Sequence, residues 1–316
     1  MNRCLAVLVA VCALTACTMA GAPERSSAAV LVGVGDQIPS TFADPNFLKL
    51  KIKRSRFFVP WNVVKDRHPR EFFEQWLAAA ETAKVEPLIS FGHAEGSKCP
   101  KKPCKLPTTG EFTKAFRAFR KRWPQLRVIS PWNEANHRSQ PTYKNPKRAA
   151  QYYNIVRKYC RGCTIVAADV IDERNMESWL KTFKKYATKP KIWGLHNYKD
   201  TNKRKGQKLG GTKRLLDAVK GKVWLTETGG IVKFILPDGR TLFKKSESRA
   251  NSATKRMFSL AKQYRSRIKR LYIYQWQAPA SSETTRFDAG LVRPDAKPRP
   301  AFKTVQRYMK SRYFNP

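Results

Sequence analysis

Eight short apolar segments, rich in β-branched and aromatic residues, recur along the chain, and most are separated by amphipathic stretches. They span residues 30–35, 56–61, 87–92, 127–132, 164–170, 192–198, 222–226 and 271–276. Between them, apolar residues recur at helical spacing over residues 71–84, 110–123, 146–159, 176–186, 212–219 and 248–264. Strands that alternate with helices of this length form right-handed βαβ units and a parallel sheet. Eight units predict an α/β fold, a single-domain (β/α)8 TIM barrel over residues 30–316.

The first unit is the least regular, because residues 42–51 carry an early proline and little helical periodicity. The alternative fold is an open, doubly wound sheet. Such sheets usually carry a glycine-rich phosphate loop after the first strand. The run Gly33-Val34-Gly35 lacks the third glycine of that loop, so the barrel is the favoured prediction.

A hairpin is expected in the loop after the seventh strand. Residues 233–236 and 240–243 are both apolar, and they flank the turn sequence Pro237-Asp238-Gly239. Two such runs around a glycine-containing turn are typical of a β-hairpin. In a barrel this insertion lies on the face formed by the strand ends, where it could wall one side of a cleft.

The first 17 residues have the pattern of an export signal. Arg3 precedes an apolar run over residues 5–14, which is shorter than the roughly 20 residues needed to span a bilayer. Leu14-Thr15-Ala16-Cys17 resembles the bacterial lipobox, so we predict cleavage before Cys17, lipidation of Cys17 and a short linker over residues 18–29. The alternative is an ordinary signal peptide that is cut later. The mature chain is expected to be extracellular or at the cell surface, with a lipid anchor as its only membrane contact.

Four of the seven cysteines lie beyond residue 17 and form two close couples, Cys99 with Cys104 and Cys160 with Cys163. An even set in an exported protein is typical of disulfides. The alternative is one zinc ion held by all four thiolates. Export and the sequence distance between the couples favour two disulfides.

The formal net charge of +40 is extreme. Such a field attracts polyanions in a salt-dependent way. The basic residues are spread along the chain, with local densities such as residues 98–105 and 117–122, and no compact nucleic-acid-binding motif accompanies them. We expect no specific nucleic-acid partner. Two interpretations of the charge stay open: solvated helix faces, or an acidic glycan or anionic envelope as the natural surroundings.

Polar side chains stand at the predicted strand ends, where parallel barrels present their catalytic groups. Glu134 follows the fourth strand and Glu227 closes the seventh. Either glutamate alone could be a salt-bridge partner in so basic a chain, but two carboxylates are what glycosidic bond cleavage needs. Asp169 and Asp172, near the fifth strand's end, could equally cap the next helix. The candidate sugar-binding residues are Arg56, Trp61, His93, Asn133, His196, Tyr198 and Trp276.

The pair Asn133-Glu134 after the fourth strand, with Glu227 after the seventh, resembles the retaining glycoside hydrolases of clan A, the 4/7 superfamily of cellulase-like TIM barrels. Further matching positions are Arg56, His196, Tyr198, Trp276 and residues 295–302. The resemblance implies that Glu134 is the general acid/base and Glu227 the nucleophile of a double displacement through a glycosyl-enzyme intermediate. No metal-ligand spacing is present, and we expect neither a metal nor a cofactor.

The two roles make opposite demands on ionisation. Glu134 must be protonated, so we expect burial beside Trp132 and the charge of Glu227 to raise its pKa. Glu227 must be ionised, and Arg56 and Tyr198 are expected to keep it so. A separation of about 5–5.5 Å between the two carboxyl groups predicts retention of anomeric configuration.

The expected function is therefore an exported retaining glycoside hydrolase, monomeric, acting on a polysaccharide or oligosaccharide. Arg240, Lys244 and Lys245 would make the hairpin wall basic, which makes an anionic glycan an attractive substrate. Neutral β-glucan, mannan and galactan are compatible with the same motif residues. The alternative function is a non-catalytic barrel that binds an anionic glycan or cell-wall polymer through its charge.

Overall fold

The computed structural model describes residues 29–203, 210–280 and 286–316. The predicted signal peptide, the lipidation site Cys17 and the linker up to residue 28 lie outside the described residues. Among the helices in the described ranges, none combines the length and the apolar character that crossing a bilayer requires.

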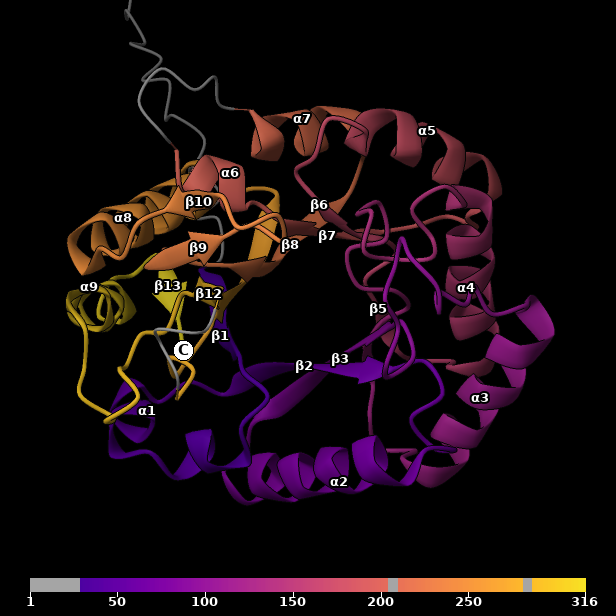
Figure 1. The fold of residues 1–316 in the computed structure, drawn as a ribbon, viewed down its shortest axis with the longest axis horizontal. Helices are drawn as coiled ribbons and strands as arrows, with labels where there is room; N and C mark the ends of the chain where they lie inside the picture. Colours follow the sequence, from indigo (N-terminus) through magenta and orange to yellow (C-terminus); the bar gives the residue numbers. More distant parts are fainter. Residues whose placement is uncertain (1–28, 204–209, 281–285) are drawn as a thin grey trace, which may run out of the picture.

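A parallel sheet curls around the centre of the molecule and helices surround it (Figure 1). The strand order is β5-β4-β3-β2-β1-β11-β8-β7-β6, and a short β13 (Phe314–Asn315) also pairs with β1. The strands of the order are β1 (Val30–Gly35), β2 (Arg54–Pro60), β3 (Glu86–Gly92), β4 (Val128–Ser130), β5 (Thr164–Ile165), β6 (Asp169–Ile171), β7 (Ile192–His196), β8 (Lys222–Thr228) and β11 (Ile268–Tyr274).

The predicted fifth strand is divided into β5 and β6, and the sheet closes across this division. β5 pairs with β4, whereas β6 pairs with β7. Between them, the Val166 amide donates to the Ile129 carbonyl at 2.9 Å and the Ala167 amide donates to the Ile192 carbonyl at 2.8 Å. One stretch of chain thus changes partner halfway along, and the (β/α)8 barrel prediction is confirmed.

The predicted helices form within a few residues of their expected ends. On α2, Phe73, Trp76 and Ala80 are buried against the sheet, as their spacing indicates. The irregular first unit forms a 3-10 turn (Pro39–Ala43) and a short α1. The helices are α1 (Pro45–Leu50), α2 (Arg67–Thr82), α3 (Thr109–Arg122), α4 (Pro146–Tyr159), α5 (Met176–Tyr186), α6 (Tyr198–Thr201), α7 (Gly211–Ala218), α8 (Glu247–Gln263) and α9 (Pro300–Met309).

The interior of the barrel is apolar on the side where the strands begin. Leu88, Val128, Val166, Trp224 and Tyr272 form one buried cluster there. A Cβ on residue 33 of β1 would lie 2.6 Å from the Tyr272 ring, so this strand needs its glycine to admit the tyrosine. This apolar layer separates Arg56, His196 and Glu227, which lie towards the strand ends, from Glu86 and Arg270, which pair on the side of the strand starts.

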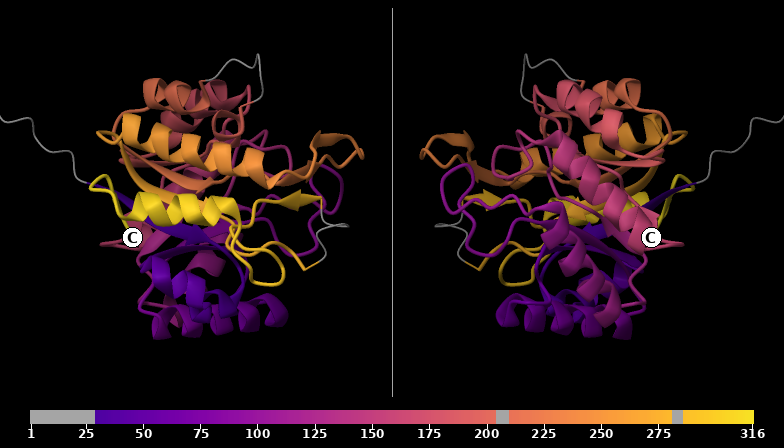
Figure 2. Two further views of the ribbon diagram at one scale, coloured as in Figure 1. Left: turned by 90° about the vertical axis from the view of Figure 1, so that its left-hand side faces the viewer. Right: turned by 90° about the vertical axis from the view of Figure 1, so that its right-hand side faces the viewer.

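The expected hairpin is present as β9 (Lys233–Ile235) and β10 (Thr241–Phe243). A third strand, β12 (Phe287–Asp288), pairs with β9 and was not predicted. Figure 2 shows this small sheet projecting from one end of the barrel. Arg240 at the hairpin pairs with Asp238, so its charge is largely compensated, while Lys244 and Lys245 are exposed.

Both predicted disulfides are confirmed. Cys99 is bonded to Cys104, with Cα atoms 4.8 Å apart, and Cys160 to Cys163, with Cα atoms 5.5 Å apart. Since each sulfur is bonded within its own couple, the four cysteines are not available as ligands of a single zinc ion.

Candidate active site

A β-bulge in β8 turns Glu227 into the barrel. Against β7, the register advances from Gly194–Trp224 to His196–Glu227, and against β11 it shifts in the same place, so β8 holds one extra residue. A bulge of this kind re-aims a side chain that simple alternation would point the other way. Thr226 and Glu227 therefore both face the interior.

Arg56 links Glu227 to the rest of the site. The guanidinium is buried, with 4% exposure, and its Nη1 donates to Glu227 Oε2 at 2.7 Å while its Nη2 donates to Asn133 Oδ1. The Tyr198 hydroxyl donates to the other Glu227 oxygen at 2.9 Å. Burial and the charge of Glu227 raise the pKa of Tyr198 well above its ordinary value, so this hydroxyl stays a donor. Both Glu227 oxygens are thus held in place.

Glu134 lies in a strained loop immediately after β4. Its φ of 44° falls in the left-handed region, which costs a residue with a Cβ about 1–2 kcal/mol. The chain is tied down on either side, because the Asn133 amide donates to the Phe91 carbonyl at 2.6 Å and the Ala135 amide donates to the Asp169 carbonyl at 2.9 Å. The neighbouring strands therefore impose the conformation that presents the Glu134 carboxylate.

His196 is fully buried and bridges two carboxylates. Its Nδ1 lies 3.1 Å from Glu134 Oε1 and its Nε2 lies 3.3 Å from Asp169 Oδ1. Burial alone would lower the pKa of His196, but the charges of Glu227 and Asp169 raise it to about 10. His196 is therefore protonated at neutral pH, and both ring nitrogens are donors.

The expectation that the pKa of Glu134 is raised is wrong for this free site. Burial does push it upward, but the hydrogen bond from His196 and the charge of that imidazolium lower the pKa of Glu134 below its ordinary value. The prediction took account of Trp132 and Glu227 as neighbours but not of the histidine. In the free site the shared proton therefore rests on His196.

Glu134, His196 and Glu227 can each offer one ligand atom, all within 4.8 Å of one another. They are nevertheless a poor metal site. The ring nitrogens of His196 lie 3.1 Å from Glu134 and 3.3 Å from Asp169, and a metal would have to displace the first of these contacts. Arg56 also places a positive charge 2.7 Å from Glu227, where a metal cation would be repelled.

A cavity of about 310 Å³ opens above the two glutamates. It is large enough for a small sugar but not for a long polymer segment. Among the predicted residues, Arg56, His93, Asn133, Glu134 and Glu227 line it. Sequence patterns did not predict the remaining lining residues, which are Gly35, Asp36, Gln37, Phe58, Ser139, Gln140 and Tyr274.

Trp276 does not face the cavity, which corrects its proposed role as a sugar platform. Its indole is fully buried between Phe47 and Phe302, and its Nε1 donates to Asp44 at 2.9 Å. The ring that the last strand turns towards the cavity is Tyr274, two residues earlier. Alternation would give residues 274 and 276 the same face, but β11 ends at Tyr274 and the chain bends there.

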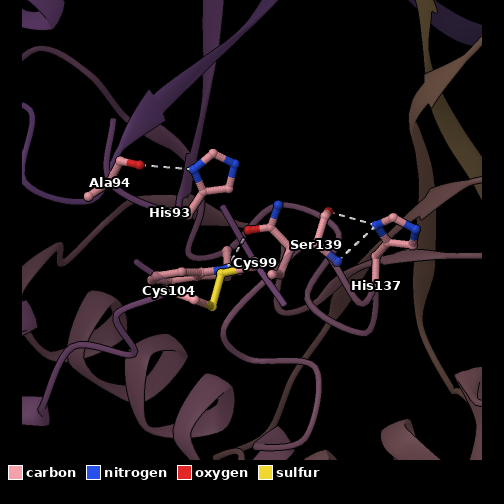
Figure 3. Close-up of a disulfide and its surroundings, with 8 residues drawn as sticks. His93, Ala94, Cys99, Cys104, His137 and Ser139 are labelled. Carbon is pink, nitrogen blue, oxygen red and sulfur yellow. Dashed lines mark hydrogen bonds between the residues drawn. A yellow bond between two sulfur atoms is a disulfide. The ribbon is translucent and has the colours of Figure 1, made fainter. Parts of the chain in front are cut away.

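The other aromatic candidates are placed differently from one another. Trp61 is half-buried and packs against the hydrophobic core, outside the residues that line the cavity. His93 lines the cavity and contacts the backbone carbonyl of Ala94 at 3.0 Å. Figure 3 shows His93 in the same region as the Cys99–Cys104 disulfide and the contact between His137 and Ser139.

Asp169 is the functional candidate that the sequence left undecided. Its carboxylate is fully buried beneath His196 and also accepts hydrogen bonds from Ser130 and Thr226. Burial would raise the pKa of Asp169, but the charge of His196 and its hydrogen bond lower it to about 2. A Cβ on residue 194 of β7 would lie 2.4 Å from this carboxylate, so the strand needs a glycine at this position. In the sequence, a glycine between two apolar strand residues was the pattern that could have indicated a buried polar neighbour.

Asp172, in contrast, is a helix cap. One of its oxygens accepts from the backbone amides of Lys199 and Asp200 at the start of α6. The short α6 carries Tyr198, so Asp172 acts on the position of the site and not on its chemistry.

Comparisons with known proteins support the fold. No protein-family model matches the sequence, and no curated protein matches it. A family 39 glycoside hydrolase from the gut symbiont Bacteroides cellulosilyticus WH2 is similar in structure, with a TM-score of 0.60 and 17% identity over 87% of this chain, which spans 62% of that one.

Two further solved structures are similar to the same degree. A GH10 endoxylanase from a sugarcane soil metagenome has a TM-score of 0.61 and 14% identity, covering 90% of this chain and 98% of its own. A GH39 β-xylosidase from Caulobacter crescentus has a TM-score of 0.60 and 13% identity, covering 90% and 71%. The expected resemblance to clan A barrels is thus confirmed at the level of the fold, and the chemistry rests on the site itself.

Proposed function

We propose that this chain is an exported retaining glycoside hydrolase that cleaves O-glycosidic bonds by double displacement. The observation that carries the proposal is the pair Glu134 and Glu227, of which one carboxylate oxygen of each lies within 4.8 Å of one of the other, beside the cavity. Retaining enzymes hold their two carboxyl groups about 5–5.5 Å apart, and inverting enzymes about 6.5–9.5 Å apart. The short separation favours retention.

In the first step, Glu227 attacks the anomeric carbon. A bond forms between that carbon and a Glu227 oxygen as the glycosidic C–O bond breaks, and the leaving oxygen takes a proton from Glu134. Arg56 and Tyr198 orient the attacking carboxylate. Asn133 lies beside it, bound through Arg56, where its amide can reach a sugar hydroxyl.

His196 supplies the proton for this step. In the free site the proton lies on Nδ1, 3.1 Å from Glu134 Oε1, and it passes to Glu134 as the leaving oxygen gains charge. In the second step Glu134 takes a proton from the attacking water and passes it to His196, which the first step leaves neutral. The ester on Glu227 is then hydrolysed and the site returns to its starting charge.

Export is supported by the N-terminal pattern around Arg3 and the apolar run that follows it. The two disulfides fit an oxidising compartment. Lipidation of Cys17 is part of the same proposal, and mass spectrometry of the mature N-terminus tests it.

The catalytic proposal is tested with Glu227→Gly and Glu134→Ala on a panel of aryl glycosides and polysaccharides. We expect Glu227→Gly to lose turnover and to regain it with azide, releasing a glycosyl azide. Glu134→Ala is expected to lose about 10²–10⁴-fold in kcat/KM on substrates with poor leaving groups. Glu71→Gln, an exposed glutamate on α2, is the matched control and should be unaffected.

Full activity of Glu227→Gly would contradict the assignment. A non-catalytic barrel that binds an anionic polymer predicts something else: no hydrolysis by the wild type, and polymer binding that is indifferent to Glu134→Gln and collapses with added salt.

A further inference from the structure

A second concavity, of about 850 Å³, lies between α3 and α4 on the outer wall of the barrel. We propose that this groove binds a uronic-acid polysaccharide and holds the polymer beside the cleft. The inference rests on the proposed glycosidase function and names a substrate class for it. Figure 1 shows the two helices adjacent to each other on the outside of the sheet.

Three cations on one face of α3 line the groove. Lys114, Arg117 and Lys121 are exposed and are spaced three and four residues apart, so they point the same way. Within the part of the chain that the structure describes, none of the three forms an ion pair. Arg117 instead lies over the ring of Tyr159, 5.6 Å from its centroid.

The absence of acidic partners is local to the groove. No acidic residue is among those that line it. Immediately outside it, Lys105 pairs with Glu111 and Arg122 pairs with Glu74. Like charges at this spacing destabilise a helix, so an anionic ligand along α3 would relieve a repulsion that the protein leaves uncompensated.

The size of the charged strip indicates an extended ligand. Seven residues of α-helix span roughly 10 Å, so the strip from Lys114 to Lys121 is longer than a single small anion and matches several charges in a row. Between the cations the groove offers neutral polar groups, Thr113 and Gln151, which suit sugar hydroxyls. No aromatic ring lines it, whereas proteins that bind single-stranded nucleic acids stack bases on aromatic side chains.

The groove runs along α3, and one of its ends lies at the same end of the barrel as the cleft. Its lining begins at Thr109 and Gly110, the first turn of α3. In a (β/α)8 barrel the first turn of a helix lies near the carboxyl end of the strand before it, and here that strand, β3, leads directly into the cavity residue His93. The disulfide-closed loop, which lies between His93 and Thr109 in the sequence, exposes two further cations, Lys101 and Lys102.

The test compares two triple variants of equal charge. Lys114→Gln/Arg117→Gln/Lys121→Gln removes the groove cations. Lys303→Gln/Arg307→Gln/Lys310→Gln removes three exposed cations from α9 and its C-cap, which have the same composition and the same spacing in reverse order. Binding of polygalacturonate is measured by calorimetry in a Glu227→Gln background, which prevents turnover.

We expect the groove triple to weaken polygalacturonate binding by about tenfold or more relative to the α9 triple, as loss of three exposed charge contacts would. Both triples should keep wild-type kcat/KM on a small aryl glycoside when Glu227 is intact. Equal weakening by both triples would overturn the proposal, because binding would then follow net charge alone.

Two other polyanions are probed in the same way. Groove-dependent binding of polyphosphate, or of a single-stranded oligonucleotide, at least as tight as that of polygalacturonate would overturn the assignment to a uronic-acid polymer. The two proposals fail separately: aryl glycoside hydrolysis without groove-dependent binding contradicts only the groove, and groove-dependent binding without any hydrolysis contradicts only the catalytic assignment.

Discussion

Asp169 sets the charge balance around the two glutamates although it does not reach the cavity. Four cationic or hydroxyl neighbours converge on it: His196 at 3.3 Å, Arg56 at 3.5 Å, Ser130 at 3.3 Å and Thr226. By holding His196 protonated, it controls how readily Glu134 can be given a proton. Asp169 is therefore a positioning residue that acts through His196.

Asp169→Asn should keep the shape of this contact and remove its charge. The pKa of His196 falls as a result, so the alkaline limb of the pH profile of kcat/KM should move to lower pH by about 1–3 units. The measurement is a pH–rate profile on one aryl glycoside. Asp172→Asn, which removes the charge of the buried carboxylate that caps α6, is the control and should leave the limb in place. An unmoved limb in Asp169→Asn would exclude His196 as the source of the proton.

At the residue scale, the rule that a parallel barrel carries its catalytic groups at the strand ends predicted most of the site but not all of it. It predicted that Arg56, Asn133, His196 and Tyr198 would gather around the glutamates, and the structure brings all four there. It missed Asp169, because a sequence does not reveal whether a carboxylate at a strand end faces the barrel or the next helix. It placed Trp276 in the cleft because the pattern does not show where β11 ends.

At the scale of elements, α2 shows how periodicity separates buried from exposed rings. Helical spacing over residues 71–84 predicts one apolar stripe of five residues, 72, 73, 76, 77 and 80. Phe72 and Phe73 both belong to it, yet Phe72 is 39% exposed and Phe73 is fully buried against Phe57 and Trp123. A stripe of five residues is wider than the helix face that meets the sheet, so its edge stays in solvent.

Phe73→Ala should lower the free energy of unfolding by about 3–5 kcal/mol, since it leaves a cavity in a packed aromatic layer. Phe72→Ala makes the same chemical change one residue away and should cost less than half as much. Urea unfolding followed by circular dichroism measures both. Equal losses would show that the layer around Phe73 is loosely packed.

The helices and most strands could be predicted because their burial repeats with a fixed period. The division of the fifth strand could not, because residues 164–171 form an apolar run whichever neighbour they pair with. The strand β12 is two residues long and forms by pairing with β9, so no local sequence pattern predicts it.

At the scale of the whole molecule, a net charge of +40 coexists with buried carboxylates that are not fully compensated. Burial and the charge of Asp200 raise the pKa of Asp172 to about 7. Burial also raises the pKa of Asp36 to about 6, against four backbone hydrogen bonds that lower it. Burying these carboxylates costs free energy, but the fold follows from the eight repeated strand and helix units. The barrel could therefore be predicted from the pattern of strands and helices alone.

These carboxylates make stability depend on pH. The pKa of Asp172 is raised from 3.8 in the unfolded chain to about 7 in the folded one, so the folded state takes up a proton as pH falls through 7 and gains stability. Asp172→Asn is neutral at every pH and accepts the same backbone hydrogen bonds. Its Tm should therefore exceed that of the wild type at pH 8, and the difference should shrink towards pH 5. Calorimetry at fixed ionic strength measures it, and a constant difference would contradict the shift.

The extra residue in β8 bears on how such barrels diverge. Trp224 and Thr226 face inward by simple alternation, and Glu227 joins them only because the strand is one residue too long for its neighbours. Deleting the residue after Glu227 would restore simple alternation and turn the carboxylate towards the helices, whereas deleting Leu225 before it would leave the carboxylate facing inward. A barrel that has this carboxylate in its site and one that lacks it there can then differ only in the length of one strand. A comparison of conserved residues alone would not distinguish the two.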